Sequence, residues 1–229
     1  MKHSESTFTV DGLSIYGQYW EPETETRAVL LVVHGAGEHS GRYDRLAEYC
    51  ATRGYAVAAL DHPGHGRSEG QRVHVRRFAD FLGALERFHE RVSADFPGVP
   101  KFLLGHSLGG LISSHYLRGH QPDFVGCILS GPAIKTDIEP GVVQTWLIRT
   151  LSLVYPTAGV LQLDASGVSR DKAEVERYLN DPLVYNGKLT ARLVSELFGA
   201  MEEIHSGAAD IHLPLLLLHG GEDAMASPE

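Results

Sequence analysis

The residues most informative about chemistry are 105–109, which read Gly-His-Ser-Leu-Gly. They match the pattern G-x-S-x-G and lie between a run typical of a strand, 102–104, and a run typical of a helix. A sharp reversal from strand to helix would hold the Ser107 hydroxyl above a sheet, where it could act as a nucleophile. The backbone N–H of Leu108 would then point at the oxyanion formed by attack on a carbonyl carbon. A serine that only caps a helix between chance glycines is the alternative.

A serine hydroxyl is a weak nucleophile, so it requires a base, an acid that orients the base, and a second oxyanion donor. Residues 34–37, His-Gly-Ala-Gly, follow the apolar run 28–33, and we expect the N–H of Ala36 to be that donor. The acid should follow a later strand. Asp223 comes just after the apolar run 213–219 and is our prediction for the acid, with Glu222 as its rival.

The general base is the one member of this set that the sequence does not supply in the expected order. No histidine follows Asp223, although the chain has thirteen histidines. His34, His39, His106 and His219 stand near the expected site, but packing or hydrogen bonding explains each of them better, because a base must reach serine and acid together. We therefore expect the base, with a last strand and helix, to belong to a C-terminal part beyond this sequence.

The elements that must position these residues alternate along the chain. Two short β-like runs, 7–10 and 13–20, are joined by Asp11-Gly12, which favours a tight hairpin. Over residues 28–130, patterns typical of strands alternate with patterns typical of helices: strands at 28–33, 55–60, 101–105 and 125–130, and helices at 43–53, 78–96 and 108–119. This alternation predicts an α/β fold with a mostly parallel sheet and helices on both faces.

The pattern changes after residue 131. Residues 132–207 contain no strand pattern of comparable quality, whereas 172–180 and 190–205 are typical of helices, the latter with one apolar face. The apolar run 213–219 then restores the strand pattern. We therefore divide the chain into the first part of a core, 1–131, a helical insertion, 132–207, and a second, incomplete part of the core, 208–229.

Composition and charge narrow the class of protein and its partners. The 229 residues fit one compact domain with an insertion. The net charge of −9 argues against a nucleic-acid partner. The longest apolar runs, 28–33 and 213–218, are far shorter than the roughly 20 residues that cross a bilayer, and the N-terminus does not resemble a signal peptide. We expect a cytoplasmic protein.

The remaining histidine pairs, the glycine-rich loop and the cysteines show no pattern typical of a metal or cofactor site, so we expect neither. The pairs His62-x-x-His65 and His34-x4-His39 stand in loops without a Cys or carboxylate at ligand spacing. Residues 34–37 lack the G-K-S/T ending and the G-x-G-x-x-G spacing of phosphate loops. Cys50 and Cys127 are too few for a disulfide framework, and we expect two buried free thiols, with a single bridge as the alternative.

With these motifs in place, the chain resembles the α/β-hydrolases, and among them the monoacylglycerol lipase family. The resemblance rests on residues 34–43, 61–70, 105–110, 169–172 and 180–183. It implies that residues 132–207 form a helical cap over the site. It also implies the nucleophile, acid and oxyanion roles given above, and it adds three substrate-binding residues near a glycerol group: Glu38, Arg42 and Tyr178. The alternatives are an ion pair that only braces the loop and a tyrosine that only packs.

The resemblance implies a serine ester hydrolase that cleaves monoacylglycerols, or similar lipid esters, to glycerol and fatty acid through an acyl-enzyme. The cap would meet a membrane surface transiently, so the protein would be peripheral at membranes. Six apolar cap residues would wall an acyl tunnel, face lipid or form the cap's own core: Val142, Val143, Trp146, Leu147, Leu151 and Leu153. Lysophospholipase, general carboxylesterase and proline aminopeptidase-like activities are the alternatives within the class. A binding module or an inactive fragment that lacks the base is the alternative outside it, and the oligomeric state is left open.

Overall fold

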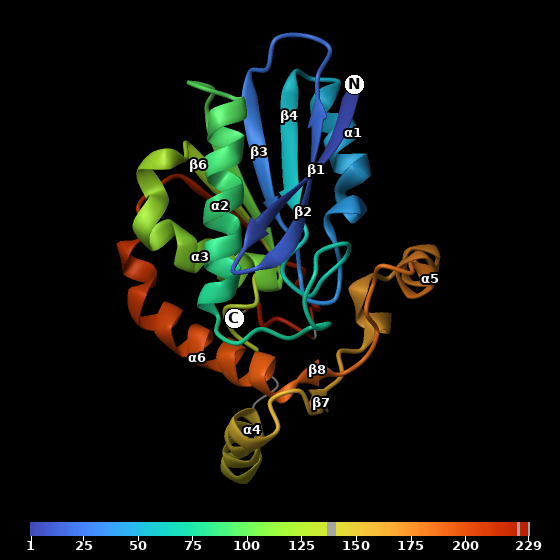
Figure 1. Cartoon of the computed structure of the whole chain (residues 1–229), viewed down its shortest axis with the longest axis vertical. Helices are drawn as coiled ribbons and strands as arrows, with labels where there is room; N and C mark the ends of the chain where they lie inside the picture. Colours follow the sequence, from blue (N-terminus) through green and yellow to red (C-terminus); the bar gives the residue numbers. More distant parts are fainter. Residues whose placement is uncertain (137–140, 224, 229) are drawn as a thin grey trace.

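The computed structural model describes residues 1–136, 141–223 and 225–228. Its centre is a seven-stranded sheet in the order β1-β2-β4-β3-β5-β6-β9 (Figure 1). The strands are β1 Lys2–Val10, β2 Leu13–Glu21, β3 Ala28–Val33, β4 Tyr55–Leu60, β5 Lys101–His106, β6 Gly126–Ser130 and β9 Leu215–Leu218. The pairs from β4 through β3, β5 and β6 to β9 are parallel, and β1 and β2 are antiparallel. The mostly parallel α/β fold predicted from the sequence is therefore confirmed.

The hairpin at the N-terminus forms where Asp11-Gly12 predicted it. Both turn residues have positive φ, 49° for Asp11 and 83° for Gly12, as a two-residue turn with the twist of the flanking strands requires. Val10 pairs with Leu13, so the turn fixes the register of the whole hairpin. The strands are longer than predicted because the polar residues at their outer ends continue the same pairing.

Helices cover both faces of the sheet. The helices α2 Ala79–Asp95 and α3 Leu108–His120 lie on one face, and α1 Asp44–Ala51, preceded by the 3-10 turn η1 Ser40–Tyr43, lies on the other (Figure 1). Successive residues of a strand point to opposite faces. Leu31 and Val33 accordingly pack in the large cluster with α2 and α3, whereas Val32 packs with Ala47 of α1.

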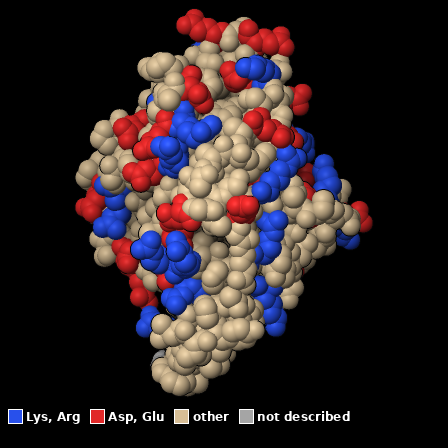
Figure 2. Space-filling view, viewed as in Figure 1, with Lys and Arg blue, Asp and Glu red and all other residues tan. Residues whose placement is uncertain are grey.

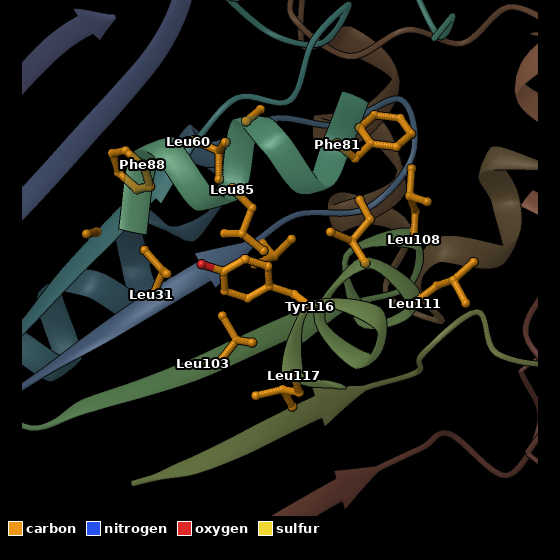
Figure 3. Packing of buried hydrophobic residues seen from close by; sticks show 14 of the residues in the cluster. Leu31, Leu60, Phe81, Leu85, Phe88, Leu103, Leu108, Leu111, Tyr116 and Leu117 are labelled. Carbon is orange, nitrogen blue, oxygen red and sulfur yellow. The ribbon is translucent and has the colours of Figure 1, made fainter. Parts of the chain in front are cut away.

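The large cluster is the main core of the protein. Leu85 and Phe88 of α2 and Tyr116 and Leu117 of α3 pack over the strand residues Leu31 and Leu103 (Figure 3). Leu31 and Leu103 are fully buried, and burial of each such side chain contributes about 1.5–3 kcal/mol to folding. This packing fixes α3 on the sheet, and α3 begins directly after Ser107.

Residues 132–207, called the cap segment below, leave the sheet after β6. They contain α4 Val142–Val154, β7 Gly159–Leu161, the 3-10 turn η3 Ala165–Val168, α5 Lys172–Asn180, β8 Leu189–Thr190 and α6 Ala191–Gly207. The last turn, η4 Ala208–Asp210, leads to β9. The small sheet β7–β8 escaped the sequence analysis because its strands have only three and two residues. Helix α4 projects away from the main sheet (Figure 1).

The expectation of two buried thiols is right for Cys127 and wrong for Cys50. Both cysteines are free, and Cys127 is buried in β6, but Cys50 is only partly buried in α1. Cys50 is one of the partly buried residues that pack against the smaller cluster. Among the described helices, none has the length and apolar character needed to cross a bilayer.

Candidate active site

Ser107 occupies a strained turn between β5 and α3. Its backbone has φ 51° and ψ −119°, a conformation that is costly for a residue with a side chain. Neighbouring backbone holds it there: the Ser107 N–H donates to the Ser130 carbonyl at 3.1 Å, and the Ser107 carbonyl accepts from the N–H of Ala133 at 2.9 Å. The strand-to-helix reversal predicted from residues 105–109 is thus the structure observed.

Two glycines make this turn sterically feasible. A Cβ atom on Gly105 would lie 2.5 Å from the Gly109 carbonyl oxygen, and one on Gly109 would collide with the Val33 carbonyl and lie 2.6 Å from that of His34. The start of α3 therefore lies directly against the end of β3. Any side chain at position 109 would push apart the two segments that carry the predicted oxyanion donors.

The loop after β3 lies beside the nucleophile. A Cβ atom on Gly35 would lie 3.2 Å from Ser107 Cβ, and Ala36 lines the same two pockets as Ser107. Leu108 is the first residue of α3, so its N–H is one of the helix donors without an intrahelical partner. The structure thus brings together the segments that carry the two predicted oxyanion N–H groups, those of Ala36 and Leu108.

Glu38 is buried and braces this loop. Its Oε1 accepts the Gly35 N–H at 2.6 Å and the Tyr43 hydroxyl at 3.0 Å, and its Oε2 lies 3.1 Å from Arg42 Nε. Burial acts to raise the pKa of Glu38, but His106, the Gly35 N–H and Arg42 outweigh it and hold that pKa below its ordinary value. Glu38 is therefore ionised, and the predicted pair with Arg42 exists.

A group of buried histidines lies beneath the same loop. His34 Nδ1 donates to the Gly35 carbonyl at 2.8 Å, and His34 Nε2 accepts the His62 N–H at 2.9 Å. The rings of His34 and His62 are 4.3 Å apart, and those of His34 and His65 are 5.4 Å apart. Burial lowers the pKa of all three, that of His65 to about 3. They are therefore neutral packing groups that support the loop.

Asp223 lies in the loop that follows β9 and lines the same pocket as Ser107. Its Oδ1 accepts the N–H groups of Met225 and Ala226 at 2.9 and 3.0 Å, which fixes the carboxylate. Its rival Glu222 is directed into solvent, where it forms an ion pair with Arg170 and keeps 79% of its side chain exposed. The geometry therefore favours Asp223 as the acid.

The four histidines nearest the site have other partners. His34 and His106 contact the carbonyls of Gly35 and Ser130. His39 Nε2 lies 2.9 Å from Asp181 Oδ2, and His219 Nε2 lies 3.1 Å from the Ala226 carbonyl and 3.4 Å from Asp223 Oδ2. Within the part of the chain that the structure describes, no hydrogen bond joins a histidine ring to the Ser107 hydroxyl. None of the four is positioned as the base.

Two pockets of opposite character meet at Ser107. The polar pocket is lined by charged and hydroxyl side chains that include Glu38, Arg42, Tyr178 and Asp223. The Arg42 guanidinium lies 4.5 Å from the centre of the Tyr178 ring, so the cap segment closes over the ion pair. Burial raises the pKa of the Tyr178 hydroxyl, which keeps it protonated and able to donate.

The apolar pocket is the part of the site that the sequence analysis missed. Its walls come mainly from β7, β8 and α6, with side chains that share an aliphatic or aromatic character: Leu161, Leu163, Leu189, Val194, Leu197, Phe198 and Met201. The apolar face of the 190–205 pattern was the signal that could have found it. None of the described residues among those expected to wall an acyl tunnel lines this pocket.

Those cap residues face outward instead. Val143, Trp146 and Leu153 of α4 keep 78%, 66% and 74% of their surface exposed, and Leu147 keeps 49%. Leu151 is partly buried, and the side chain of Val142 lies outside the described residues. The exposure of these four side chains favours the lipid-facing reading over the tunnel wall, because α6 rather than α4 supplies the helical wall of the apolar pocket at Ser107.

Two further cap residues attach the cap segment to the loop after β3. Asp181 contacts His39 as described above, and the Tyr185 N–H donates to the Gly37 carbonyl at 2.7 Å. The sequence analysis used residues 180–183 as a motif but gave Asp181 and Tyr185 no role. Their partners are more than 140 residues away in sequence, so local patterns could not reveal them.

The comparisons with known proteins agree with this geometry. Residues 24–229 match the family described as serine aminopeptidase, S33. The chain is 37% identical to a monoacylglycerol lipase of Mycolicibacterium smegmatis, over 97% of this chain and 80% of that protein. It is 35% identical to the human monoglyceride lipase, over 94% of this chain and 71% of that protein. The crystal structure of a Paleococcus ferrophilus monoacylglycerol lipase superimposes with a TM-score of 0.83 at 32% identity, covering 93% of this chain and 80% of that one.

The parallel sheet, the strained turn at Ser107 and the family match define the class of protein. It is a serine ester hydrolase with the α/β-hydrolase fold. The identity to named lipases extends over nearly the whole chain, in the core and in the cap segment alike. More particularly, the chain belongs to the monoacylglycerol lipase family.

Proposed function

We propose that this chain hydrolyses monoacylglycerols to glycerol and a fatty acid through an acyl-enzyme formed on Ser107. The observation that carries the proposal is the meeting of a polar and an apolar pocket at the serine. Both pockets include Ala36, Ser107, Leu163, Leu189 and Met225 in their lining. An ester with one hydroxyl-rich end and one long hydrocarbon end has the complementary distribution of polarity.

In this mechanism the Ser107 hydroxyl attacks the ester carbonyl and gives its proton to a histidine base that Asp223 orients. The negative oxygen of the tetrahedral intermediate accepts hydrogen bonds from the N–H groups of Ala36 and Leu108, each worth about 3 kcal/mol of the barrier. The ester C–O bond then breaks and glycerol leaves with the proton. Water attacks the acyl-enzyme by the same route and releases the fatty acid.

The polar pocket supports a glycerol leaving group over a phosphorylated one. Arg42 is the only Lys or Arg among the described residues that line it, and Glu38 already neutralises that guanidinium. Asp164 and Asp223 add negative charge to the same pocket. A phosphate would therefore meet repulsion, whereas glycerol hydroxyls can donate to these carboxylates and accept from Tyr178.

The exposed side chains of α4 support contact with a lipid surface. Trp146 and Leu153 lie on a helix that projects from the molecule, and the tip where α4 lies carries few charged side chains in Figure 2. Apolar side chains gathered on a projecting helix favour an interface with lipid, from which a poorly soluble substrate must be taken. We propose that the cap segment rests transiently on the membrane surface during catalysis.

The test of this function is hydrolysis by the purified full-length protein. Wild type should release oleate from monooleoylglycerol much faster than from lysophosphatidic acid with the same acyl chain. Ser107→Ala should lower turnover by about a thousandfold or more, with an unchanged circular dichroism spectrum. Unchanged turnover in Ser107→Ala would exclude Ser107 as nucleophile, and faster lysophosphatidate hydrolysis would refute the glycerol assignment.

Covalent labelling separates an enzyme from a binding module of the same fold. A fluorophosphonate probe reacts with a serine only when its hydroxyl is activated. We expect labelling of wild type that is absent in Ser107→Ala, with the label found on Ser107 by peptide mass spectrometry. A wild-type protein that binds lipid but takes up no label would support the binding-module alternative.

A further inference from the structure

Three side chains that could bind a metal lie together at the end of α3 that is remote from Ser107. His89 comes from α2, His120 is the last residue of α3, and Asp123 ends the 3-10 turn η2 Gln121–Asp123. A ring nitrogen of each histidine and a carboxylate oxygen of Asp123 all lie within 4.8 Å of one another. This group shares no residue with either pocket at Ser107.

His89 is a buried imidazole with unused bonding capacity. Only 6% of its surface is exposed. Its Nδ1 lies 2.9 Å from the Tyr116 hydroxyl, whereas its Nε2 is buried without a partner among the described residues. A buried polar atom without a partner is costly and calls for an explanation.

The spacing of the other two ligands suits an ion better than a direct contact. His120 Nδ1 lies 3.4 Å from Asp123 Oδ2, which is long for a hydrogen bond. Two ligands bonded at about 2.0–2.1 Å to one tetrahedral ion lie about 3.4 Å apart. The His120 ring is held in place by stacking on Tyr116, with centroids 4.1 Å apart and planes at 10°. His120 is partly exposed and Asp123 is exposed, so an ion can enter from solvent.

The surrounding charges also favour a cation. Glu86 Oε1 lies 4.0 Å from His120 Nε2, where a carboxylate can orient a ligating histidine through its second nitrogen. Glu90 on α2 adds negative charge near His89, and Lys101 opposes it. The carbonyl end of α3 also points toward this group, and helix C-termini attract positive charge.

We propose that His89, His120 and Asp123 bind one divalent transition-metal ion, and that Zn²⁺ is the ion they fit. Imidazole and carboxylate are ligands that Zn²⁺ prefers, and three protein ligands leave a fourth position for water. The ion would join α2 to the last turn of α3. It takes no part in ester hydrolysis, because the nucleophile lies at the opposite end of α3.

The experiment is a calorimetric titration of tag-free, chelator-dialysed protein with Zn²⁺ alone. We expect one Zn²⁺ per wild-type chain, and affinity at least about tenfold weaker in His120→Ala and in Asp123→Asn. His205→Ala removes an exposed histidine of α6 outside this group and should bind as wild type does. The buried His89 is left unchanged because its removal would disturb the core.

A second measurement separates this site from the other histidines of the chain. Saturating Zn²⁺ should raise the melting temperature of wild type and His205→Ala but not that of His120→Ala or Asp123→Asn. Circular dichroism without metal should be the same for all four proteins. Equal Zn²⁺ affinities in wild type and both ligand variants, or no Zn²⁺ binding by wild type, would overturn the proposal.

Discussion

His39 Nε2 lies 2.9 Å from Asp181 Oδ2, and this contact joins segments 142 residues apart in the chain. His39 belongs to the loop that follows β3, and Asp181 directly follows α5 of the cap segment. Asp181 is fixed from its own side as well, because its Oδ1 accepts the Leu183 N–H at 2.9 Å. The position of the loop after β3 and the position of the cap segment therefore depend on each other.

Asp181→Ala should loosen the cap segment over the polar pocket. A hydrogen bond to a charged group that is partly exposed contributes about 1 kcal/mol, so we expect KM for monooleoylglycerol to rise about fivefold. Asp181→Asn keeps an acceptor for the Leu183 N–H but turns an amide NH2 toward the protonated His39 Nε2, so it should recover only a small part of the loss. Steady-state kinetics of the three proteins check this, and equal KM values would show that the contact does not position the cap segment.

Gly109→Ala should disrupt the turn that carries Ser107. The new Cβ atom would strike the backbone of the Val33 and His34 peptide groups, which cannot rotate away as a side chain can. We expect a loss of about 3 kcal/mol in the free energy of unfolding, together with loss of fluorophosphonate labelling.

The matched control is Gly83→Ala in α2, where a Cβ atom meets nothing within 4 Å. Because alanine favours the helix over glycine, this variant should be more stable by about 0.5–1 kcal/mol. Urea denaturation measures both changes. Tolerance of alanine at position 109 would mean that the close packing of α3 on β3 is not required.

Asp223→Asn should separate the two candidate acids. Asparagine keeps the shape of the side chain but cannot stabilise a protonated histidine, so we expect kcat to fall about a thousandfold or more. Glu222→Gln alters only a solvent-exposed ion pair with Arg170 and should change kcat less than twofold. The reverse order of effects would identify Glu222 as the acid.

Because His34, His62 and His65 are buried, we expect the protein to lose stability in mild acid. Their folded pKa values lie below the unfolded value of about 6.5, so below that pH the unfolded chain binds protons that the folded chain does not. As the pH falls from 6.5 toward 3, the free energy of unfolding should decrease by up to about 1.4 kcal/mol per pH unit for each histidine.

His65→Gln should make this pH dependence shallower, because it removes the histidine whose pKa falls to about 3. Urea denaturation at pH 6.5, 5.5 and 4.5 gives the slope for each protein. His205→Gln, at an exposed position of α6, should keep the wild-type slope. The prediction fails if His65→Gln and wild type lose stability in parallel.

The lipid-contact proposal predicts a change in vesicle binding without a change in chemistry. Trp146→Ser combined with Leu153→Ser removes two exposed apolar side chains, each worth about 1.5–3 kcal/mol when buried. We expect at least tenfold less protein bound to phosphatidylcholine vesicles containing monooleoylglycerol, and unchanged hydrolysis of a soluble short-chain ester. Tyr49→Ser, which alters an exposed aromatic residue of α1, is the matched control. Equal vesicle binding would exclude α4 as the contact.

Sequence patterns predicted those structural features that depend on residues adjacent in the chain. The turn at Ser107 could be foreseen because its glycines and its flanking apolar runs are adjacent in sequence. The placement of Asp223 in the pocket at Ser107 could be foreseen, because a loop after a parallel strand faces the same edge of the sheet as Ser107. The α/β alternation follows from the same regular patterns.

Features built from distant segments could not be predicted in this way. The apolar pocket combines β7, β8 and α6 with the loop after β6, and two of these elements are too short to recognise. The group of His89, His120 and Asp123 depends on how α2 packs against α3, so the two histidines, 31 positions apart in number, show no ligand spacing. The exposure of α4 depends on where the cap segment docks.

The polar pocket also bears on what happens once the ester is cleaved. Its lining carries three carboxylates, those of Glu38, Asp164 and Asp223, against the single guanidinium of Arg42. The acid freed by hydrolysis is itself an anion at neutral pH. Electrostatic repulsion from this lining should therefore disfavour a free carboxylate at Ser107, which favours rapid product dissociation and makes the freed acid a weak inhibitor.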